Sequence, residues 1–279
     1  MRSTDADVPV KPPLSKDTTL CISLSGRPSN IGTRFHNYLY EQLGLDFIYK
    51  AFTTTDIAAA IGGVRALGIR GCSVSMPFKQ DVMALVDDVE DSAHAIGAVN
   101  TIVNGGGRLT ASNTDYLAVR RLVVALDTEL PVVIRGSGGM AMAVGTAFRD
   151  AGFRTGTIVA RNPKSGNALA ERLGFEWRGE VRGLTAPVIV NATPIGMAGG
   201  PGENDLAFDG DVVDGADTVF DVVAMPPETP LIATARAAGK HVITGAQVIA
   251  LQAGEQFERY TGVRPAPELI EAASDYSRD

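Results

Sequence analysis

Residues 131–152 read PVVIRGSGGMAMAVGTAFRDAG, a short apolar run followed by a cluster of glycines and then a pattern with helical spacing. The stretch predicts a strand that turns directly into a helix. Glycine lets the backbone turn tightly and approach a pyrophosphate, and a helix N-terminus offers free N–H groups to it. With a strand before it and a helix after it, the cluster favours a dinucleotide-binding turn over a plain glycine turn. It has the spacing GxGxxA and consists of Gly136, Ser137, Gly138, Gly139, Met140 and Ala141.

The end of the next strand bears on the choice of dinucleotide. A site for NAD would place Asp or Glu there, about 20 residues further on, to bind the ribose 2′-hydroxyl. The predicted strand 155–161 ends instead in Ala160-Arg161 and is followed by Asn162-Pro163-Lys164. Arg161 and Lys164 can bind a 2′-phosphate, so the sequence predicts NADP(H) rather than NAD(H). The alternative is that both are solvated surface cations in a turn.

Outward from the glycine cluster, predicted strands and helices alternate in two series, a pattern typical of parallel βαβ units. The second series has strands at 131–135, 155–161, 187–192, 218–224 and 240–244. The first has strands at 19–25, 46–52 and 69–75, then a hairpin of 98–103 and 108–113 around a glycine-rich turn. From residue 247 onward only helical patterns follow.

The chain is therefore expected to be an α/β protein with two parallel-sheet domains and a cleft between them. The acidic segment 201–217 is expected to be a surface loop. We expect a flexible leader (1–17), a substrate and catalytic domain (18–115), a Rossmann NADP-binding domain (116–245) and C-terminal helices (246–279) that return to the first domain.

Composition and charge argue against several kinds of partner. The 279 residues carry a formal net charge of −7 and no run of Lys or Arg. This disfavours a nucleic-acid or anionic-membrane surface and favours a small-molecule substrate. No apolar stretch approaches the ~18 residues of a membrane span, and the polar, proline-rich N-terminus lacks the apolar core of a secretion signal. Either a monomer or a homodimer is compatible with this composition.

Cysteine and histidine usage indicates neither disulfide nor metal chemistry. Cys21 and Cys72 lie in apolar, strand-like stretches, where a free thiol behaves as a small hydrophobe. They predict inert core thiols in a reducing cytoplasm. His36, His94 and His241 show no metal-binding spacing, so no metal site is predicted. His36 is expected to be a structural residue of its helix.

Residues 73–79, SVSMPFK, place a lysine shortly after the end of a predicted strand. Lys79 would lie at the carboxyl edge of a parallel sheet, where α/β proteins bind ligands. Asp115 follows the hairpin, at the seam between the two series. A Lys and an Asp together suit alcohol–ketone chemistry, because the hydroxyl must lose a proton as its hydride departs. Lys79 would be a proton shuttle or a fixed cation, and the alternative for the pair is an ordinary salt bridge.

Taken in order along the chain, the motifs resemble those of the shikimate dehydrogenase family. They span nearly all of the sequence after residue 17. The matching pieces are Gly26-Arg27-Pro28 with His36-Asn37, Val74-Ser75-Met76-Pro77-Phe78-Lys79, Ile96-Gly97-Ala98-Val99-Asn100-Thr101, Asn113-Thr114-Asp115, the glycine cluster, Asn191-Ala192-Thr193-Pro194-Ile195-Gly196-Met197, and Leu251-Gln252-Ala253 before Phe257.

The resemblance implies an N-terminal substrate domain, an NADP-binding Rossmann domain and a C-terminal helix that returns to the substrate domain. By position, Lys79 and Asp115 match the family's catalytic pair, and Asn100 and Gln252 match residues that contact substrate hydroxyls. Ser75 stands where the family usually has threonine and keeps the hydroxyl. The resemblance adds Asn191, Thr193 and Gly245 to the predicted cofactor site.

Two departures from the family pattern fall on the predicted substrate pocket. The family's serine-x-serine stretch, which holds the substrate carboxylate, is replaced by a shorter segment in which Ser29 and Thr33 are the plausible hydroxyl donors. A tyrosine that reaches the substrate in the family is replaced by Ala224. Each change is expected to cost about 1–3 kcal/mol of binding, or up to about a hundredfold in affinity.

The sequence therefore predicts an oxidoreductase that transfers a hydride between NADP(H) and a hydroxylated cyclic carboxylate, shikimate/3-dehydroshikimate or a close relative. One alternative is a non-catalytic NADP(H) or metabolite sensor with the same fold. Another is a dehydrogenase of similar architecture with an unrelated substrate, such as a folate one-carbon or amino-acid enzyme. Asn100 and Gln252, which suit hydroxyl groups, disfavour the latter.

Overall fold

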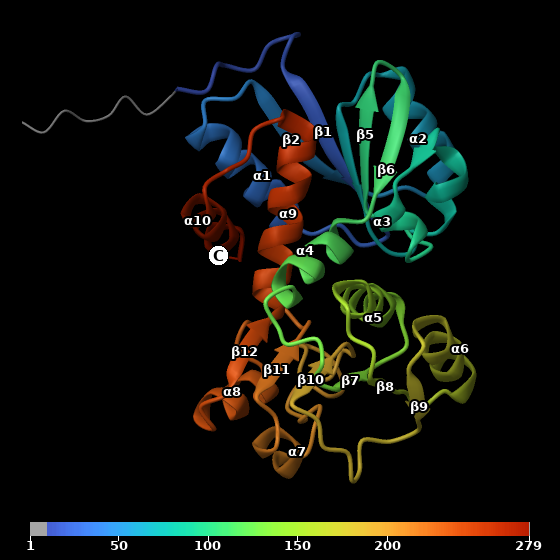
Figure 1. Cartoon of the computed structure of the whole chain (residues 1–279). Helices are drawn as coiled ribbons and strands as arrows, with labels where there is room; N and C mark the ends of the chain where they lie inside the picture. The colour runs from blue at the N-terminus through green and yellow to red at the C-terminus, as the bar shows by residue number, and fades with distance from the viewer. Residues whose placement is uncertain (1–9, 279) are drawn as a thin grey trace, which may run out of the picture. The chain divides into compact units, whose positions relative to one another are not determined.

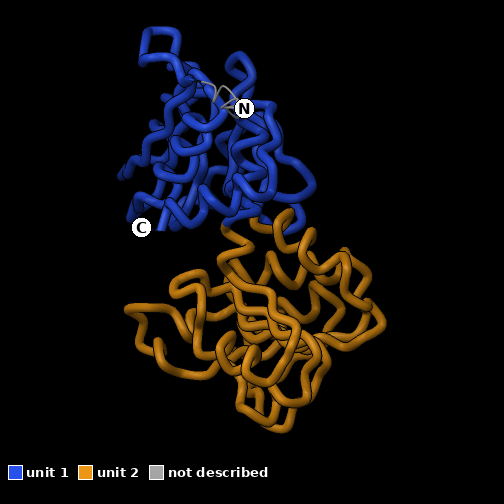
Figure 2. The backbone as a smooth tube through the Cα atoms, turned by 90° about the vertical axis from the view of Figure 1, so that its left-hand side faces the viewer, with its two compact units in different colours: residues 1–114, 250–279 blue, residues 115–249 orange. Residues whose placement is uncertain are grey.

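The computed structural model describes residues 10–278 (Figure 1). The chain divides into two compact units (Figure 2). Unit 1 comprises Met1–Thr114 and Ala250–Asp279, and unit 2 comprises Asp115–Ile249. Of the predicted leader, residues 1–9 lie outside the described part of the chain, and residues 10–15 have no regular secondary structure.

Unit 1 contains a six-stranded mixed sheet with the order β2-β1-β3-β5-β6-β4. Its parallel part is β2, β1 and β3, at one side of the sheet, where Ile22 of β1 pairs with Lys50 on one side and Cys72 on the other. The predicted hairpin, β5 and β6, adds antiparallel pairs beside β3, and the short β4 extends the sheet parallel to β6. The strands are β1 (Thr19–Leu24), β2 (Phe47–Phe52), β3 (Gly71–Val74), β4 (Asp88–Val89), β5 (Thr101–Gly105) and β6 (Arg108–Ser112).

Helices cover both faces of this sheet because successive strand residues point to opposite sides. Ile22 and Leu24 pack into one apolar cluster with α2. Cys21 packs into a second cluster with aromatic residues of α1 and α9. At Gly71 a Cβ would lie 2.3 Å from Cδ1 of Tyr260, so the close approach of α9 to β3 requires a glycine there. The helices are α1 (Ile31–Gln42), α2 (Ile57–Ala66), α3 (Asp91–His94), α9 (Gly245–Thr261) and α10 (Pro267–Arg278), with a 3-10 turn at Asp81–Leu85.

Unit 2 contains a parallel six-stranded sheet with the order β12-β11-β10-β7-β8-β9. From β7 the chain runs outward through β8 and β9, then crosses back to β10 on the other side. This reversal is the switch point of a Rossmann-type sheet, where ligands bind. The strands are β7 (Val132–Arg135), β8 (Gly156–Val159), β9 (Glu176–Arg178), β10 (Val188–Asn191), β11 (Thr218–Asp221) and β12 (His241–Thr244).

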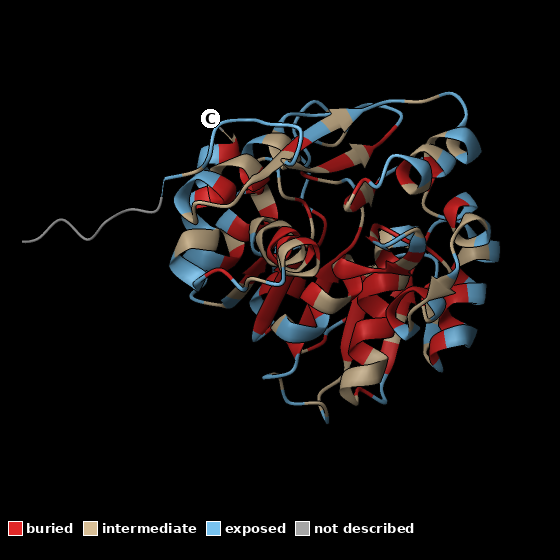
Figure 3. Cartoon of the chain, turned by 90° about the horizontal axis from the view of Figure 1, so that it is seen from above, coloured by how far each residue is buried: buried red, intermediate tan, exposed pale blue. Residues whose placement is uncertain are grey.

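The central strands β10 and β11 of unit 2 are buried along their length, and β7 is buried up to Arg135, as continuous apolar runs require. Figure 3 shows the burial of each described residue on the chain. The helix that follows β8 begins at Pro163 with Asn162 as its cap, whose side chain accepts from two backbone N–H groups. The helices are α4 (Thr114–Val123), α5 (Gly139–Ala151), α6 (Pro163–Leu173), α7 (Gly210–Asp214) and α8 (Pro230–Ala237).

Two local predictions need correction. The segment 201–217 is not only a surface loop, because it contains α7 and buries Phe208 and Val213 in the core of unit 2. Its acidic residues lie exposed around a few apolar ones, and their number concealed the helix. The edge strand β9 (Glu176–Arg178) was also missed, because three residues with charges at both ends carry little strand signal.

Candidate functional site

The segment that carries Lys79 is fixed by backbone hydrogen bonds at the carboxyl end of β3. The N–H of Ser75 donates to the carbonyl of Leu24 (2.9 Å), and the N–H of Val99 donates to the carbonyl of Lys79 (2.7 Å). Phe78 is buried in the core beneath. Lys79 is half-buried and Ser75 is exposed, as the sequence position of both at a sheet edge predicts. The turn thus holds a lysine beside a hydroxyl on a rigid base.

Asn100 and Gln252 belong to one polar cluster in unit 1. Asn100 is 3% exposed, and its Oδ1 accepts from Oγ1 of Thr101 (2.8 Å) and from the backbone N–H of Thr114 (2.8 Å). The hydroxyl of Thr114 lies 3.2 Å from both Oδ1 of Asn100 and Oε1 of Gln252. The structure therefore brings together the two residues that the sequence assigns to substrate hydroxyls.

Asp115 follows Thr114 directly and lies in the first turn of α4. Thr114 is fully buried and bonded to Asn100, so the cluster fixes the point at which α4 begins. Lys79 falls in unit 1 and Asp115 at the start of unit 2, and their pairing stays a prediction.

The predicted carboxylate donors lie at the start of α1. Ser29 is exposed just before the helix, and Thr33 is half-buried in its first turn. The N-cap residue Asn30 makes no side-chain hydrogen bond to the helix. The first N–H groups of α1 are therefore not capped by Asn30, and they add donors beside the two hydroxyls.

The glycine cluster has the geometry of a nucleotide turn. Gly136 has φ +132°, and a Cβ there would lie 2.7 Å from the carbonyl oxygen of Ala192, so only glycine fits. Gly138 caps α5 without a side-chain bond. A Cβ at Gly138 or Gly139 would meet no atom within 4 Å, and both residues are exposed. The N-terminus of α5 thus presents backbone donors to open space, which suits a pyrophosphate.

The cations after β8 lie beside this turn within unit 2. Arg161 and Lys164 are exposed at the start of α6. Oγ of Ser137 in the glycine cluster lies 2.8 Å from Oγ of Ser165 in the first turn of α6, so the turn and the helix are joined. Burial lowers the pKa of Arg135, which precedes the glycines; nearby Asp209 raises it, and Arg161 lowers it further. Arg135 thus contributes positive charge close to Arg161.

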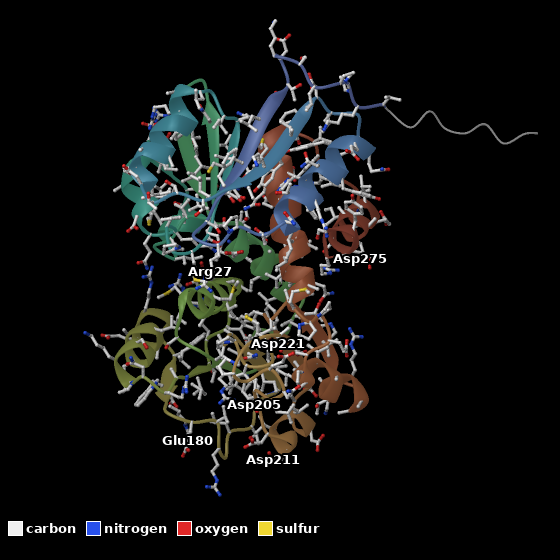
Figure 4. All side chains as sticks on the ribbon, turned by 180° about the vertical axis from the view of Figure 1, so that it is seen from behind. Arg27, Glu180, Asp205, Asp211, Asp221 and Asp275 are labelled. Carbon is white, nitrogen blue, oxygen red and sulfur yellow. The ribbon has the colours of Figure 1, made fainter. Side chains whose placement is uncertain are left out.

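Asp221, a buried carboxylate at the end of β11, is labelled in Figure 4 and binds Asn191, one of the predicted cofactor residues. Oδ1 of Asp221 accepts from Nδ2 of Asn191 and from the N–H of Val223, both at 3.0 Å. Oγ1 of Thr193 donates to Oδ1 of Asn191 (2.6 Å). A Cβ at Gly245 would lie 2.4 Å from the carbonyl oxygen of Val223. Asp221 therefore orders the segments after β10 and β11.

The environment of Asp221 is polar without a cation. Oγ1 of Thr229, the N-cap of α8, donates to its Oδ2 at 2.7 Å. None of the ion pairs within residues 10–278 includes Asp221. Burial raises the pKa of Asp221 to about 6, while the hydrogen bonds from Thr229, Val223 and Asn191 hold it lower than burial alone would.

Comparison with known proteins identifies the family. A family model described as the shikimate dehydrogenase substrate binding domain matches residues 30–102. A shikimate dehydrogenase-like protein of Haemophilus influenzae is 55% identical over 267 residues, which cover 95% of this chain and 98% of that protein. The chain belongs to the shikimate dehydrogenase family.

Solved structures of the shikimate dehydrogenase family agree. A shikimate 5-dehydrogenase-like protein matches with a TM-score of 0.93 at 55% identity, covering 95% of this chain and 100% of that one. The shikimate 5-dehydrogenase of Thermus thermophilus, in complex with NADP(H) and shikimate, matches with a TM-score of 0.83 at 28% identity, covering 93% and 99%. The family resemblance and the two α/β domains with a Rossmann sheet are thereby confirmed. The protein is an oxidoreductase by family.

Three residues near the predicted shikimate dehydrogenase site were missed from the sequence. Asp221 could have been suspected because it interrupts the apolar run TVFDVVA at a strand end. Gln256 follows Gln252 at helical spacing and so shares its face of α9. Ser165 gives no signal in the sequence. Within residues 10–278 the structure shows neither a group of metal-binding side chains nor a helix able to span a membrane.

Proposed function

We propose that the protein transfers a hydride between NADP(H) and a hydroxylated cyclic carboxylate, shikimate/3-dehydroshikimate or a close relative. The observation that carries this proposal is the polar cluster of Asn100, Thr114 and Gln252. Thr114 directly precedes Asp115, and the other two residues offer amide groups suited to ring hydroxyls. A sugar-like or cyclitol-like ring needs several such groups, because each buried hydroxyl must find a hydrogen-bond partner.

The residues present fit NADP(H). The uncapped start of α5 would bind the pyrophosphate through backbone N–H groups, with Gly138 and Gly139 leaving it room. Arg161 and Lys164 would bind the 2′-phosphate, with Arg135 adding to the positive potential. Asn191, Thr193 and Gly245, ordered around Asp221, would complete the site. When bound, the nicotinamide accepts or supplies the hydride.

The chain's own residues would handle the proton. As an alcohol is oxidised, its hydroxyl proton must leave, and Lys79 with Asp115 would hold or carry it at that oxygen. Asn100 and Gln252 would orient the ring, so that the reacting carbon stands in one position relative to Lys79. Whether Lys79 accepts the proton or only stabilises the oxygen as a fixed cation changes the pH profile of turnover, not the residues involved.

The test is NADP⁺ reduction by the purified protein with shikimate, quinate and related acids, with NAD⁺ in parallel. Lys79→Ala is expected to lower turnover at least about 100-fold while NADPH binding is retained. Lys16→Ala is the matched control, because Lys16 is an exposed lysine of unit 1 in a surface pair with Asp17. Unchanged turnover in Lys79→Ala would remove Lys79 from the mechanism.

A second candidate, a non-catalytic NADP(H) or metabolite sensor, is favoured by one feature, Ala224 in place of the family's tyrosine. Ala224 is half-buried in the segment after β11 and supplies no phenol. Tight NADPH binding without turnover of any cyclic hydroxy acid would support the sensor. A cytoplasmic location is part of the leading proposal, supported by the free, buried thiols of Cys21 and Cys72.

A further inference from the structure

His36 is a buried histidine that the proposed mechanism does not use. It lies in α1 at 1% exposure, stacked 4.3 Å from the ring of Tyr49 and 6.2 Å from that of Phe257. Burial lowers its pKa to about 3. The imidazole is therefore neutral near pH 7 and carries one N–H, on either Nδ1 or Nε2.

A hydrogen bond with Gln256 raises the pKa of His36 against the effect of burial. The orientation of Gln256 follows from its other partners. Its Nε2 lies 3.4 Å from the backbone carbonyl oxygen of Asn100 and 3.0 Å from Oγ1 of Thr101. A carbonyl oxygen can only accept, so the amide nitrogen of Gln256 is the donor on this side.

The orientation of Gln256 then fixes the next hydroxyl. Gln256 presents Nε2 to Oγ1 of Thr101, at 3.0 Å. Because Thr101 accepts this bond, its own hydrogen is free to point elsewhere, and the nearest acceptor is Oδ1 of Asn100 at 2.8 Å. Gln256 is 4% exposed and Thr101 0%, so water does not compete at either position.

Asn100 is the last acceptor in this chain of hydrogen bonds. Its Oδ1 accepts from Thr101 and from the backbone N–H of Thr114, which occupies the oxygen with donors. Among residues 10–278 no hydrogen bond is made by Nδ2 of Asn100. The hydroxyl of Thr114 also meets Oε1 of Gln252. Both amides of the proposed substrate site therefore turn their oxygens toward the protein.

We propose, on the basis of the proposed function, that Gln256 is a positioning residue that acts through Thr101 to hold Asn100 with its amide nitrogen toward the ligand, so that the ligand group bound there is a hydrogen-bond acceptor. A hydroxyl, keto or carboxylate oxygen meets this requirement. An ammonium substituent does not, because it can only donate. Gln256 and Thr101 thereby set which substituents the site accepts.

The first test separates orientation from simple packing. Thr101→Val keeps the shape of the side chain and removes the relay hydroxyl, whereas Thr101→Ser keeps the hydroxyl. Thr101→Val is expected to raise KM for shikimate about tenfold with kcat changed much less, and Thr101→Ser to restore it. Thr146→Val is the matched control, since Oγ1 of Thr146 is buried without a partner in unit 2. A KM within twofold of wild type in folded Thr101→Val would overturn the proposal.

Non-additivity gives a second readout. Gln256→Met removes the amide at similar length and is expected to raise KM as Thr101→Val does. Because both act through the same bonds, the double variant should be little worse than either single one. Multiplied effects in the double variant would mean that the two residues act separately, and the relay would be wrong.

A third measurement needs no turnover. Calorimetry of shikimate binding to the protein measures the affinity that the relay is expected to set. Thr101→Val is expected to weaken this binding about tenfold, and Thr101→Ser to restore it. Binding that Thr101→Val leaves unchanged would overturn the proposal. If no cyclic acid is turned over while binding responds in this way, the proposed function fails and the relay stands.

Discussion

His36 in unit 1 and Asp221 in unit 2 are both buried, titratable and part of a hydrogen-bond network, yet they differ in charge near pH 7. Burial lowers the pKa of His36 to about 3, so it is neutral. Burial raises the pKa of Asp221 to about 6, so most of its carboxyl groups are ionised at pH 7. Their different partners explain this: one amide serves His36, and three donors converge on Asp221.

The difference shows two ways of ordering a site with buried polar groups. The neutral network in unit 1 carries direction, because each donor fixes the next acceptor. The network in unit 2 carries a charge, which draws donors from the ends of two strands and from the cap of α8. The first network should respond to changes of hydrogen-bond polarity and the second to changes of pH within the working range.

The largest expected effect is the acid sensitivity of unit 1. The folded pKa of His36, about 3, lies below its unfolded value of 6.5. Its contribution to stability is therefore fully present above pH 6.5 and is lost as pH falls toward 3, by about 5 kcal/mol in all. Urea denaturation from pH 7.5 to 4 should show the stability of wild type falling toward that of His36→Phe. A gap that stays constant with pH would contradict a buried neutral histidine.

Asp221 should act in the opposite direction. Its folded pKa, about 6, lies above the unfolded value of 3.8. The contribution to stability is present below pH 3.8 and is lost as pH rises through 6, by about 3 kcal/mol. Asp221→Asn should remove this dependence, and hydrogen exchange of β10 and β11 peptides would locate it in unit 2.

If NADPH affinity in wild type falls below pH 6 and Asp221→Asn shows no such change, the same titration also affects the proposed cofactor site.

The sequence predicted the elements whose signals are local. The strand and glycine cluster at 131–141 can be predicted directly, because the apolar run, the GxGxxA spacing and the helix occur in one stretch. The alternation of strands and helices likewise predicted both sheets. Ser29 and Thr33 remain predictions by resemblance. Lys79 and Asp115, predicted from their places in the chain and from the resemblance, remain a predicted pair.

The networks could not be predicted, because their members are far apart in the chain. Gln256 and Thr101 meet only after α9 packs on the sheet of unit 1. The sequence indicated a structural role for His36 but gave no sign of the rings of Tyr49 and Phe257 that stack on it. Asp221 was missed, and its charge depends on Thr229 and Asn191.

Asn100→Asp puts a carboxylate into the neutral hydrogen-bond network of unit 1 without changing the size of the side chain. Asn100→Asp keeps an oxygen for Thr101 and Thr114 but replaces the ligand-facing donor with an acceptor. Affinity for shikimate is expected to fall about 30- to 100-fold, with NADPH affinity as the internal control. An analogue with an amine at the contacted hydroxyl should lose less than shikimate does. Equal losses for the two ligands would argue against a donor at this position.

The smallest expected effect comes from removing one hydrogen-bond donor to Asp221. Thr229→Val removes a bond to Oδ2 and also the cap bond from the N–H of Ile232, whereas Thr229→Ser keeps both. The loss of a donor raises the pKa of Asp221 further, so the ionised form becomes costlier. Thr229→Val should therefore lose about 1–2 kcal/mol of unfolding free energy at pH 8 and less at pH 4.5, where Asp221 is largely protonated. Equal losses at both pH values would assign the whole effect to the helix cap, and the charge of Asp221 would then not depend on Thr229.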